Sequence, residues 1–333
     1  MKTSVVILNW NGVSWLEKFL PSVVKNTPNA KIIVADNGST DDSKKYVNQN
    51  HSDVLFIENK VNLGYAGGYN RAVQEIVKIY PDHEFCVFLN SDVDPQKEWL
   101  EPLERRMIEN PNIGALQPKI LDYNNPDNFE YAGAAGGLID KWGYPFARGR
   151  IFESLEKDKG QYDSPEFTKI FWASGACLMV RLSAFYESGS LDERLFAHME
   201  EIDLCWRMQT QNYDIESCSS SVVFHVGGGT LGSLSPKKTY LNFRNSLLII
   251  CKNAPTYTAM KIISVRLFLD AAAGFLFLIR LQPRHFFSVI QAHFSFYKMF
   301  TRFTFPSQLR KKEWPKNGTY DGSIVWKHFI SKN

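Results

Sequence analysis

The chain has 333 residues, a length that suits one large domain or two medium-sized ones. Hydrophobic residues make up 44% of it and charged residues 22%, a globular composition that excludes a mostly disordered chain. The formal net charge of +3 is too small to indicate a nucleic-acid partner.

Five cysteines lie far apart in the sequence, and none forms a Cys-x-x-Cys pair. An odd, dispersed set predicts reduced thiols in a cytosolic protein, and neither a disulfide framework nor a zinc site. The apolar stretch after Met1 is short and lacks a small-residue cleavage site, so we expect no signal peptide.

The first third of the sequence alternates short apolar runs with helical patterns. Length and apolar content predict buried strands at residues 5–8, 31–34, 54–57 and 85–89. Helices are expected after them at about 14–25, from 43 onward, at 66–80 and at 97–109. Ser14 and Glu17 form a capping box for the first helix, and Asp41 is the expected N-cap of the second. Apolar strands alternating with helices indicate a parallel sheet covered on both faces.

Polar, small or acidic residues follow each of the four predicted strands. These segments are residues 9–12, 36–42, 62–71 and 90–94. Because ligands bind at the carboxyl ends of parallel strands, we expect the segments to form one polar rim. Ordinary turns use the same residue types, so a single segment is ambiguous, but four together favour a binding site.

Asp92 and Asp94 lie just past the fourth strand, where side chains reach this rim. A bound diphosphate needs a hard cation, and Mg²⁺ or Mn²⁺ is held by one or two carboxylates together with phosphate oxygens. Asp92 is therefore a predicted metal ligand, and Asp94 lies on the same side if the chain stays extended. The alternative for both is a carboxylate of the turn or N-cap before the next helix.

In combination, these segments resemble the family-2 glycosyltransferases with the GT-A fold, and within them the bacterial rhamnosyltransferase-type branch that builds polysaccharides. The motifs are Val-Val-Ile-Leu-Asn-Trp-Asn-Gly from Val5, Asp-Asn-Gly-Ser-Thr-Asp from Asp36, Asn-x-Gly-x-Ala-Gly-Gly-x-Asn from Asn62 and Leu-Asn-Ser-Asp from Leu89. The similarity covers residues 3 to about 230.

The resemblance implies an α/β fold with a central, mostly parallel sheet and a C-terminal helical region. It places a catalytic domain at residues 1–235, with a nucleotide-sugar half at about 1–95 and an acceptor half at about 96–235. Residues 236–333 then form the helical region. It also implies that the donor nucleotide and its diphosphate contact Asn9, Asp36, Asn62, Asn70, Asn90 and Asp92. The family's metal motif is Asp-x-Asp, and here its first position is Asn90, as in the rhamnosyltransferase-like branch.

A cluster of acids opens a predicted helix near residue 200. Glu200, Asp203 and Arg207 fall on one face at the spacing of an ion-pair row. Glu201 instead leads an apolar face, where a carboxylate is costly without a function or a partner. A helix N-terminus would keep it ionised, as a general base must be. The family's Glu-Asp motif, whose second acid deprotonates the acceptor hydroxyl, implies the same role for Glu201. Glu200 and Asp203 remain the alternatives.

His225 ends a predicted strand that starts at Ser221, and three glycines, Gly227 to Gly229, follow it closely. An isolated histidine is more often structural, but the resemblance implies that this one completes the metal site or contacts the diphosphate. The glycines would allow the loop to order over the bound donor. Trp172 is expected either to stack on a sugar at the acceptor site or to belong to the core.

Between Asp270 and Glu313 the sequence has no acidic residue, while basic residues alternate with phenylalanines. The most apolar run, residues 262–279, contains Arg266 and Asp270, which disfavours a membrane-spanning helix. Two interpretations stay open. One is a helical pair that lies on an anionic membrane surface. The other is a helical subdomain that packs on the catalytic domain or on a second subunit, as in a homodimer.

The sequence thus predicts an inverting glycosyltransferase of the hexosyltransferase type that depends on Mg²⁺ or Mn²⁺; inversion rests on the resemblance alone. It would move a sugar such as rhamnose from a dTDP- or UDP-linked donor to a glycan or lipid-linked glycan in polysaccharide biosynthesis. The expected location is the cytoplasm, at the inner face of the membrane if the C-terminal segment binds lipid.

The sequence also bears on three rival functions. A sugar nucleotidyltransferase would need a glycine-rich phosphate loop after the first strand, and a nicotinamide dehydrogenase would need Gly-x-Gly-x-x-Gly there. Residues 9–12 match neither pattern. A non-catalytic protein of the same fold that binds glycans or nucleotides stays open.

Overall fold

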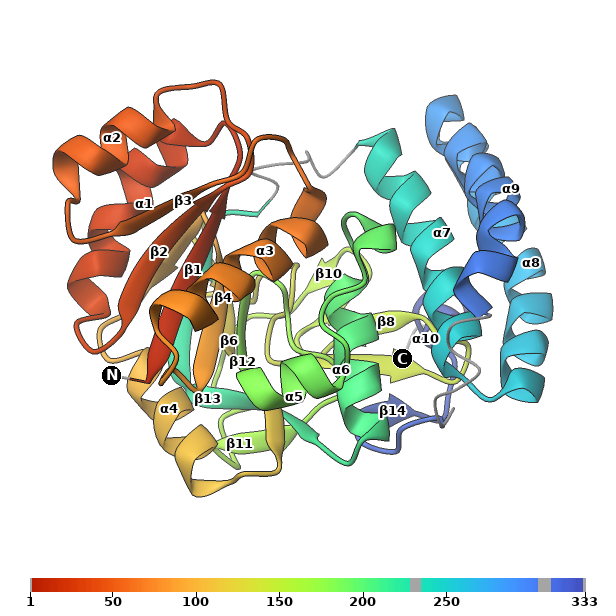
Figure 1. Ribbon diagram of the computed structural model, residues 1–333. Helices are drawn as coiled ribbons and strands as arrows, with labels where there is room; N and C mark the ends of the chain where they lie inside the picture. The colour runs from red at the N-terminus through yellow and green to blue at the C-terminus, as the bar shows by residue number, and fades with distance from the viewer. Residues whose placement is uncertain (1, 228–234, 305–312, 332–333) are drawn as a thin grey trace.

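The computed structural model describes residues 2–227, 235–304 and 313–331 (Figure 1). Its main sheet comprises β1 (Thr3–Asn9), β2 (Lys31–Asp36), β3 (Leu55–Glu58), β4 (Phe85–Asn90), β5 (Val93–Pro95), β6 (Ile113–Asp122), β11 (Phe167–Lys169), β12 (Cys177–Arg181) and β13 (Asp214–His225). The strand order is β11-β13-β6-β12-β4-β1-β2-β3, with β5 paired to β13. β4, β1, β2 and β3 are parallel, as predicted, whereas β12 runs antiparallel to both β4 and β6.

Helices cover both faces of this sheet, and the α/β fold class is confirmed. One face packs against α1 (Val13–Asn26), α2 (Ser43–Asn50) and α4 (Leu100–Glu109). The other packs against α3 (Gly64–Ile79), α5 (Leu182–Glu187), α6 (Glu200–Thr210) and α7 (Pro236–Asn253). Because successive strand side chains point to opposite faces, Val6 enters the second core while Val5 and Ile7 enter the first.

The predicted helix caps are wrong in detail. No side-chain hydrogen bond caps α1, whose N-cap position is Gly12, so Ser14 and Glu17 form no capping box. Asp41 bonds the backbone N–H of Val13 through Oδ2 at 2.9 Å instead. Asp42 holds the N-cap position of α2, although Asp41 Oδ1 still accepts the N–H of Ser43 at 3.1 Å. The Asp41 carboxylate thus accepts hydrogen bonds from backbone N–H groups at the starts of α1 and α2, which have no side-chain cap of their own.

A second, five-stranded sheet lies beside the first and was not predicted. Its order is β10-β9-β8-β7-β14. The strands are β7 (Gly137–Asp140), β8 (Pro145–Ala147), β9 (Arg150–Ile151), β10 (Ser154–Leu155) and β14 (Thr319–Tyr320). β14 comes from the C-terminal part of the chain and pairs with β7 in parallel. The far end of the chain is therefore tied back to the middle of the molecule.

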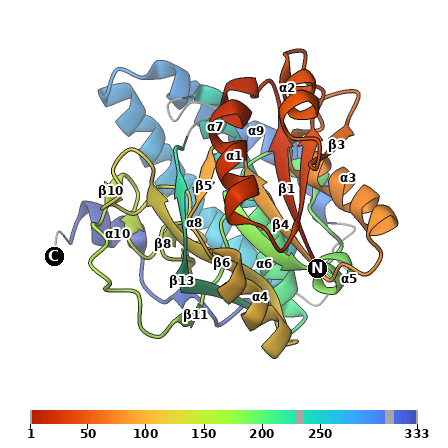
Figure 2. The same ribbon diagram turned by 90° about the vertical axis from the view of Figure 1, so that its left-hand side faces the viewer.

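The predicted C-terminal helices are present as α7, α8 (Thr256–Ile279), α9 (Pro283–Thr304) and the short α10 (Ile324–Phe329). Figures 1 and 2 place α7, α8 and α9 on the side of the molecule away from α1 and α2. α7 contributes Leu247, Leu248 and Ile250 to the core that it shares with α3 and α6. α8 and α9 pack outside α7, at the margin of the molecule.

α8 is long and apolar enough to cross a membrane by length and composition, the one helix of the described residues that is. Two of its three charged residues face inward: Arg266 and Asp270 are buried and paired, with Nε and Oδ1 2.9 Å apart. Tyr144 donates to the same carboxylate, and His293 of α9 lies 3.1 Å from its second oxygen. This pair therefore anchors α8 to the body of the protein.

Candidate active site

The polar rim begins with an asparagine and an aspartate at the ends of β1 and β2. Asn9 and Asp36 are register partners, both buried, and Asn9 Nδ2 donates to Asp36 Oδ1 at 2.9 Å. Asp36 Oδ2 accepts the backbone N–H of Ser39 at 2.8 Å. Asn9 Oδ1 has no hydrogen-bond partner among the described residues, so it remains an acceptor that faces the loop at Gly12.

Asn62 and Asn70, both predicted nucleotide contacts, form hydrogen bonds with backbone and side-chain groups of the protein itself. Asn62 Oδ1 accepts from Gly64 N at 2.8 Å and from Asn37 Nδ2 at 3.1 Å. Asn70 Nδ2 donates to Leu191 O at 2.9 Å, and its Oδ1 accepts from Leu191 N at 3.1 Å. These side chains hold the rim loop and tie α3 to the segment before α6, which is a positioning role.

Asp92 and His225 meet beyond the end of β4. His225 Nε2 lies 3.2 Å from Asp92 Oδ1 and 3.4 Å from Asn90 Nδ2. On the other side of the ring, Nδ1 lies 3.1 Å from Glu130 Oε2, within the distance of an ion pair. Glu130 carries no signal in the sequence, because it lies in an irregular segment without a motif. A carboxylate behind an imidazole is the usual orienting partner of a metal-binding histidine.

Burial and two nearby carboxylates have opposite effects on the pKa of His225. Burial disfavours the imidazolium, but hydrogen bonding and the charges of Asp92 and Glu130 outweigh it and raise the pKa of His225 to about 10. A metal ion at Nε2 would take the place of the proton, since a ligating histidine is neutral.

Asp94 forms its side-chain hydrogen bond outside the group of Asp92, His225 and Glu130. Ser22 of α1 donates to Asp94 Oδ1, and Asp94 lies in β5 opposite Phe224. Within the described residues, no group of three or more His, Cys, Asp or Glu side chains has the arrangement of a metal site. Within the part of the chain that the structure describes, Asp92 and His225 are thus only a partial set of candidate metal ligands.

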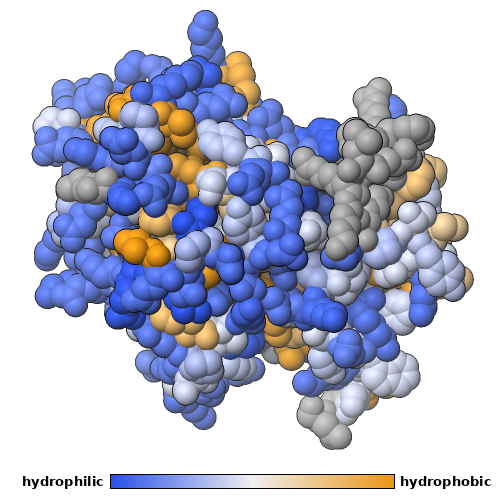
Figure 3. Space-filling view, turned by 60° about the horizontal axis from the view of Figure 1, so that its bottom comes forward, coloured by the Kyte–Doolittle hydropathy of each residue, from blue (hydrophilic) through white to orange (hydrophobic). Residues whose placement is uncertain are grey.

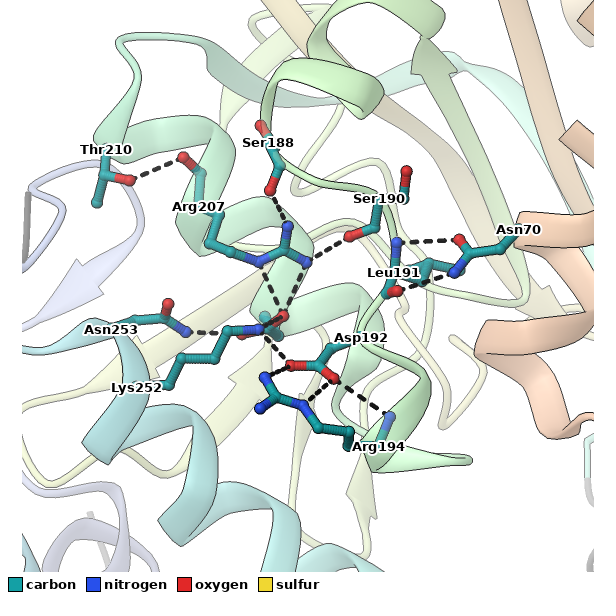
Figure 4. A network of polar contacts seen from close by, with 11 residues as sticks. Asn70, Ser188, Ser190, Leu191, Asp192, Arg194, Arg207, Thr210, Lys252 and Asn253 are labelled. Carbon is teal, nitrogen blue, oxygen red and sulfur yellow. Dashed lines mark hydrogen bonds and ion pairs between the residues drawn. The ribbon is translucent and has the colours of Figure 1, made fainter. Parts of the chain in front are cut away.

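The acids at the start of α6 have different surroundings. Asp203 is buried and receives hydrogen bonds from Arg207 Nε at 2.9 Å, Lys252 Nζ at 2.8 Å and Asn253 Nδ2 at 2.8 Å. The side chains from α6 and α7 converge in Figure 4. Burial raises the pKa of Asp203, but the charges of Arg207 and Lys252 outweigh this and lower it. Asp203 is therefore a structural anion that joins two helices. The predicted ion-pair row holds for Asp203 and Arg207, but Glu200 does not join it.

Glu200 and Glu201 have no such cation. Glu200 is buried, its Oε2 has no hydrogen-bond partner in the described residues, and burial followed by the charge of Glu201 raises its pKa well above the usual value. Glu201 is half-buried, and burial raises its pKa to about 7, against the opposing effect of backbone N–H groups. A carboxyl that titrates near neutral pH suits a general base.

Two tyrosines of α3 are affected by the charges of the α6 acids and of Asp92. Burial, Tyr69 and the charges of Glu200 and Glu201 raise the pKa of Tyr65. The rings of Tyr65 and Tyr69 are 4.6 Å apart. Burial above all raises the pKa of Tyr69, and the charge of Asp92 adds to it. The charges of the α6 acids and of Asp92 therefore act on two neighbouring tyrosines.

The segment before α6 is strained and held from two sides. Phe196, His198 and Met199 have positive φ, a conformation that costs bulky residues about 1–3 kcal/mol each. Asn245 Nδ2, on α7, donates to the carbonyl oxygens of Leu195, Ala197 and His198 at 3.1, 2.9 and 2.7 Å. On the opposite side, Gly64 has a φ of +73°, and a Cβ there would lie 2.5 Å from Phe196 O.

Two remaining predictions have plain outcomes. Trp172 is buried at 3% exposure and donates to Leu138 O at 2.9 Å, so it belongs to the core. The glycine-rich loop extends from Gly227 into residues 228–234, which lie outside the described residues.

Comparison with known proteins settles the family. The model of the family "Glycosyl transferase family 2" matches residues 4–189, more than half of the chain. The chain belongs to glycosyl transferase family 2. The prediction of a glycosyltransferase that acts in glycan biosynthesis is confirmed. The sugar nucleotidyltransferase alternative is thereby set aside.

This glycosyltransferase is 28% identical over 235 residues to an N-acetylglucosaminyl-diphospho-decaprenol L-rhamnosyltransferase of Mycobacterium tuberculosis, a match that covers 66% of the chain and 75% of that protein. Two solved structures share the fold. GalNAc-T7 with UDP, GalNAc and Mn²⁺ has a TM-score of 0.60 at 18% identity, over 77% of this chain and 49% of that one. The mannosyltransferase PcManGT of Pyrobaculum calidifontis with GDP-Man and Mn²⁺ has 0.55 at 12%, over 89% and 87%. They confirm the predicted GT-A fold.

The three hydrogen bonds of Asn245 predict a substitution effect. Asn245→Ala leaves the carbonyl groups of Ala197 and His198 without this donor, whereas Leu195 O still accepts from Arg244 Nη2 at 3.0 Å. The substitution should lower the free energy of unfolding by about 1–3 kcal/mol in chemical denaturation. The glycosyltransferase should also lose kcat, since Glu201 directly follows the loosened segment. Asn242→Ala on the same helix is the matched control and should stay within about 0.5 kcal/mol. Equal effects of the two substitutions would show that Asn245 does not hold this segment.

Proposed function

We propose that this enzyme is an inverting, metal-dependent glycosyltransferase that moves a sugar from a dTDP- or UDP-linked donor to a hydroxyl of a lipid-linked glycan. The observation that carries the proposal is that the candidate metal ligands and the candidate base belong to two separate groups of side chains. Asp92 and His225 form a ligand pair at the strand ends, and Glu201 is a half-buried carboxyl with a pKa of about 7. Rhamnose is the proposed sugar, supported by the rhamnosyltransferase from Mycobacterium tuberculosis.

The donor would lie along the rim, with its nucleotide at Asn9 and Asp36 and its diphosphate toward Asn90 and Asp92. The unpartnered Oδ1 of Asn9 is a ready acceptor for a base or ribose donor. This order follows the sheet, because β2, β1 and β4 are neighbours. In inversion, the acceptor oxygen attacks the anomeric carbon on the face opposite the leaving diphosphate, and Glu201 takes the hydroxyl proton.

The residues fit a divalent metal. Mg²⁺ and Mn²⁺ sites of this kind take one or two protein ligands and complete their shell with phosphate oxygens and water. Asp92 and His225 would hold the ion, and Glu130 would orient the imidazole from behind. When bound, the ion stabilises the charge of the departing nucleoside diphosphate. The Mn²⁺ ions in GalNAc-T7 and PcManGT support this assignment.

Glu201 can be tested through turnover and its pH dependence. Glu201→Gln should lower kcat by roughly 10²–10⁴-fold, the contribution of a general base, with donor affinity near that of the wild type. Below pH 7 the wild-type Glu201 gains a proton, because burial raises its pKa to about 7, so kcat should fall as the pH drops through that value. The variant should lose this dependence. If Glu200→Gln shows the full pattern instead, Glu201 is the wrong acid.

Asp92 can be tested through metal-dependent donor binding. Asp92→Ala should abolish the Mn²⁺-dependent part of UDP binding in calorimetry, because the ion loses its only proposed carboxylate ligand. The unfolding midpoint should stay close to that of the wild type. Asp94→Ala, two residues away, is the matched control and should retain the metal effect, since Asp94 bonds to Ser22. Full activity of Asp92→Ala, or of the wild type under strong chelation, would contradict the metal assignment.

We further propose that α8 and α9 rest on an anionic membrane. Large apolar side chains on their outer side are exposed: Tyr257, Phe268, Phe275, Ile279, Leu281, Phe287 and Phe294. Arg280 and Arg284 are exposed at the turn that joins the two helices. On the face seen in Figure 3, apolar side chains form small separate groups, some at the margin where Figure 1 has α8 and α9. Lysines and arginines around apolar side chains are typical of peripheral docking.

Liposome co-sedimentation tests this docking. Binding should require anionic lipid and weaken with salt, because each basic group near the surface contributes about 1 kcal/mol. Arg280→Glu with Arg284→Glu should weaken it strongly. Lys45→Glu with Lys60→Glu makes the same charge change on the α2–β3 side and should not. A stable dimer that binds neither neutral nor anionic liposomes would show that α8 and α9 form a subunit interface.

A further inference from the structure

A cluster of positive charge lies between the start of α7 and the second sheet. Arg150 of β9 and Lys238 of α7 both approach the ring of Tyr131, at 4.4 Å and 5.6 Å from its centroid. Arg150 is only 8% exposed, its Nε has no hydrogen-bond partner, and no carboxylate of the described residues forms an ion pair with it. A buried cation without a paired anion is expensive unless a ligand supplies the charge.

The first turn of α7 adds to this positive potential. α7 has 18 residues, no acidic residue in its first turn and no side-chain cap. It carries Lys237 and Lys238 there instead, although cations oppose the helix dipole at an N-terminus. Burial above all lowers the pKa of Lys238, and the charge of Arg150 lowers it further. Glu130 is the carboxylate whose charge reaches both cations, and it also serves His225.

The cluster lies next to the proposed base. The pKa of His198 falls to about 4 through burial and the charge of Lys238, and its Nε2 has no partner among the described residues. His198 is two residues before Glu200, and Lys237 stands over the ring of Phe196 at 5.3 Å from its centroid. The cluster therefore flanks the strained segment that leads into Glu201. In Figure 1, β1 and β2, at the proposed nucleotide end of the rim, lie to the left of α3, whereas α7 begins to its right.

We propose that Arg150, Lys238 and the N-terminus of α7 bind a phosphate group of the acceptor, beside the hydroxyl that receives the sugar. This inference rests on the proposed function and specifies its acceptor as a phosphate or diphosphate ester. Helix N–H groups, a lysine and an arginine fork are the groups that bind phosphate in proteins. The donor diphosphate is proposed to lie at Asp92 and His225, so the acceptor phosphate would occupy a neighbouring subsite, and Glu130 interacts with His225 and with both cations.

Binding of a soluble prenyl diphosphate to the full-length enzyme tests the proposal. Geranyl diphosphate is titrated by calorimetry into protein saturated with UDP and Mg²⁺, so that the donor site is already filled. Lys238→Ala and the conservative Arg150→Lys should each raise the Kd of this probe by about tenfold or more, the loss of one charge-assisted hydrogen bond. The Kd of UDP should change less than about twofold, and Lys45→Ala should leave both values unchanged.

The outcomes separate the sources of phosphate. If the variants weaken UDP binding and leave the probe unaffected, the cluster serves the donor and the proposal is wrong. It is equally wrong if the wild type does not bind the probe, or if folded variants bind it normally. The assay measures binding without turnover, so a failure of Glu201 as the base would not change the Kd values that it compares.

Discussion

Three carboxylates occupy the first turn of α6, and the two buried cations beside them, Arg207 and Lys252, both bind the third, Asp203. This division determines what each acid can do. Asp203 stays ionised and ties α6 to α7. Glu200 and Glu201 have no cation partner among the described residues, and burial raises their pKa values. Had one cation paired with Glu201, its pKa would lie too low for a base that works near neutral pH.

The same junction between α6 and α7 organises the rest of the site. Asn245 holds the strained segment before α6, and Lys252 and Asn253 hold the helix itself. At its other end α7 presents Lys238 to Arg150 across the ring of Tyr131. One helix thus positions the proposed base and borders the proposed acceptor phosphate site. The proposed donor site lies at the strand ends instead, so the two substrates would meet separate parts of the fold.

Sequence patterns predicted the four N-terminal strands because each is a continuous apolar run that ends in polar residues. They missed the second sheet, since strands of two to four residues such as β9 carry no periodicity. Motif spacing named Asp92 and His225, which the structure brings together, but also Asp94 and Asn70. The direction of the last two side chains depends on contacts with Ser22 and Leu191 that no local pattern encodes. Glu130, Asn245 and Lys238 act through tertiary contacts alone and left no signal.

The central claim is the proposal that Asp92 and His225 hold a divalent metal with the donor diphosphate, while Glu201 acts as the general base. A crystal grown with UDP and Mn²⁺, measured for the anomalous signal of manganese, tests it directly. The account predicts one anomalous peak within about 2.0–2.2 Å of an Asp92 oxygen and His225 Nε2, bridged to the diphosphate of UDP. Ordered UDP with manganese elsewhere, or with no manganese at those two side chains, would contradict it.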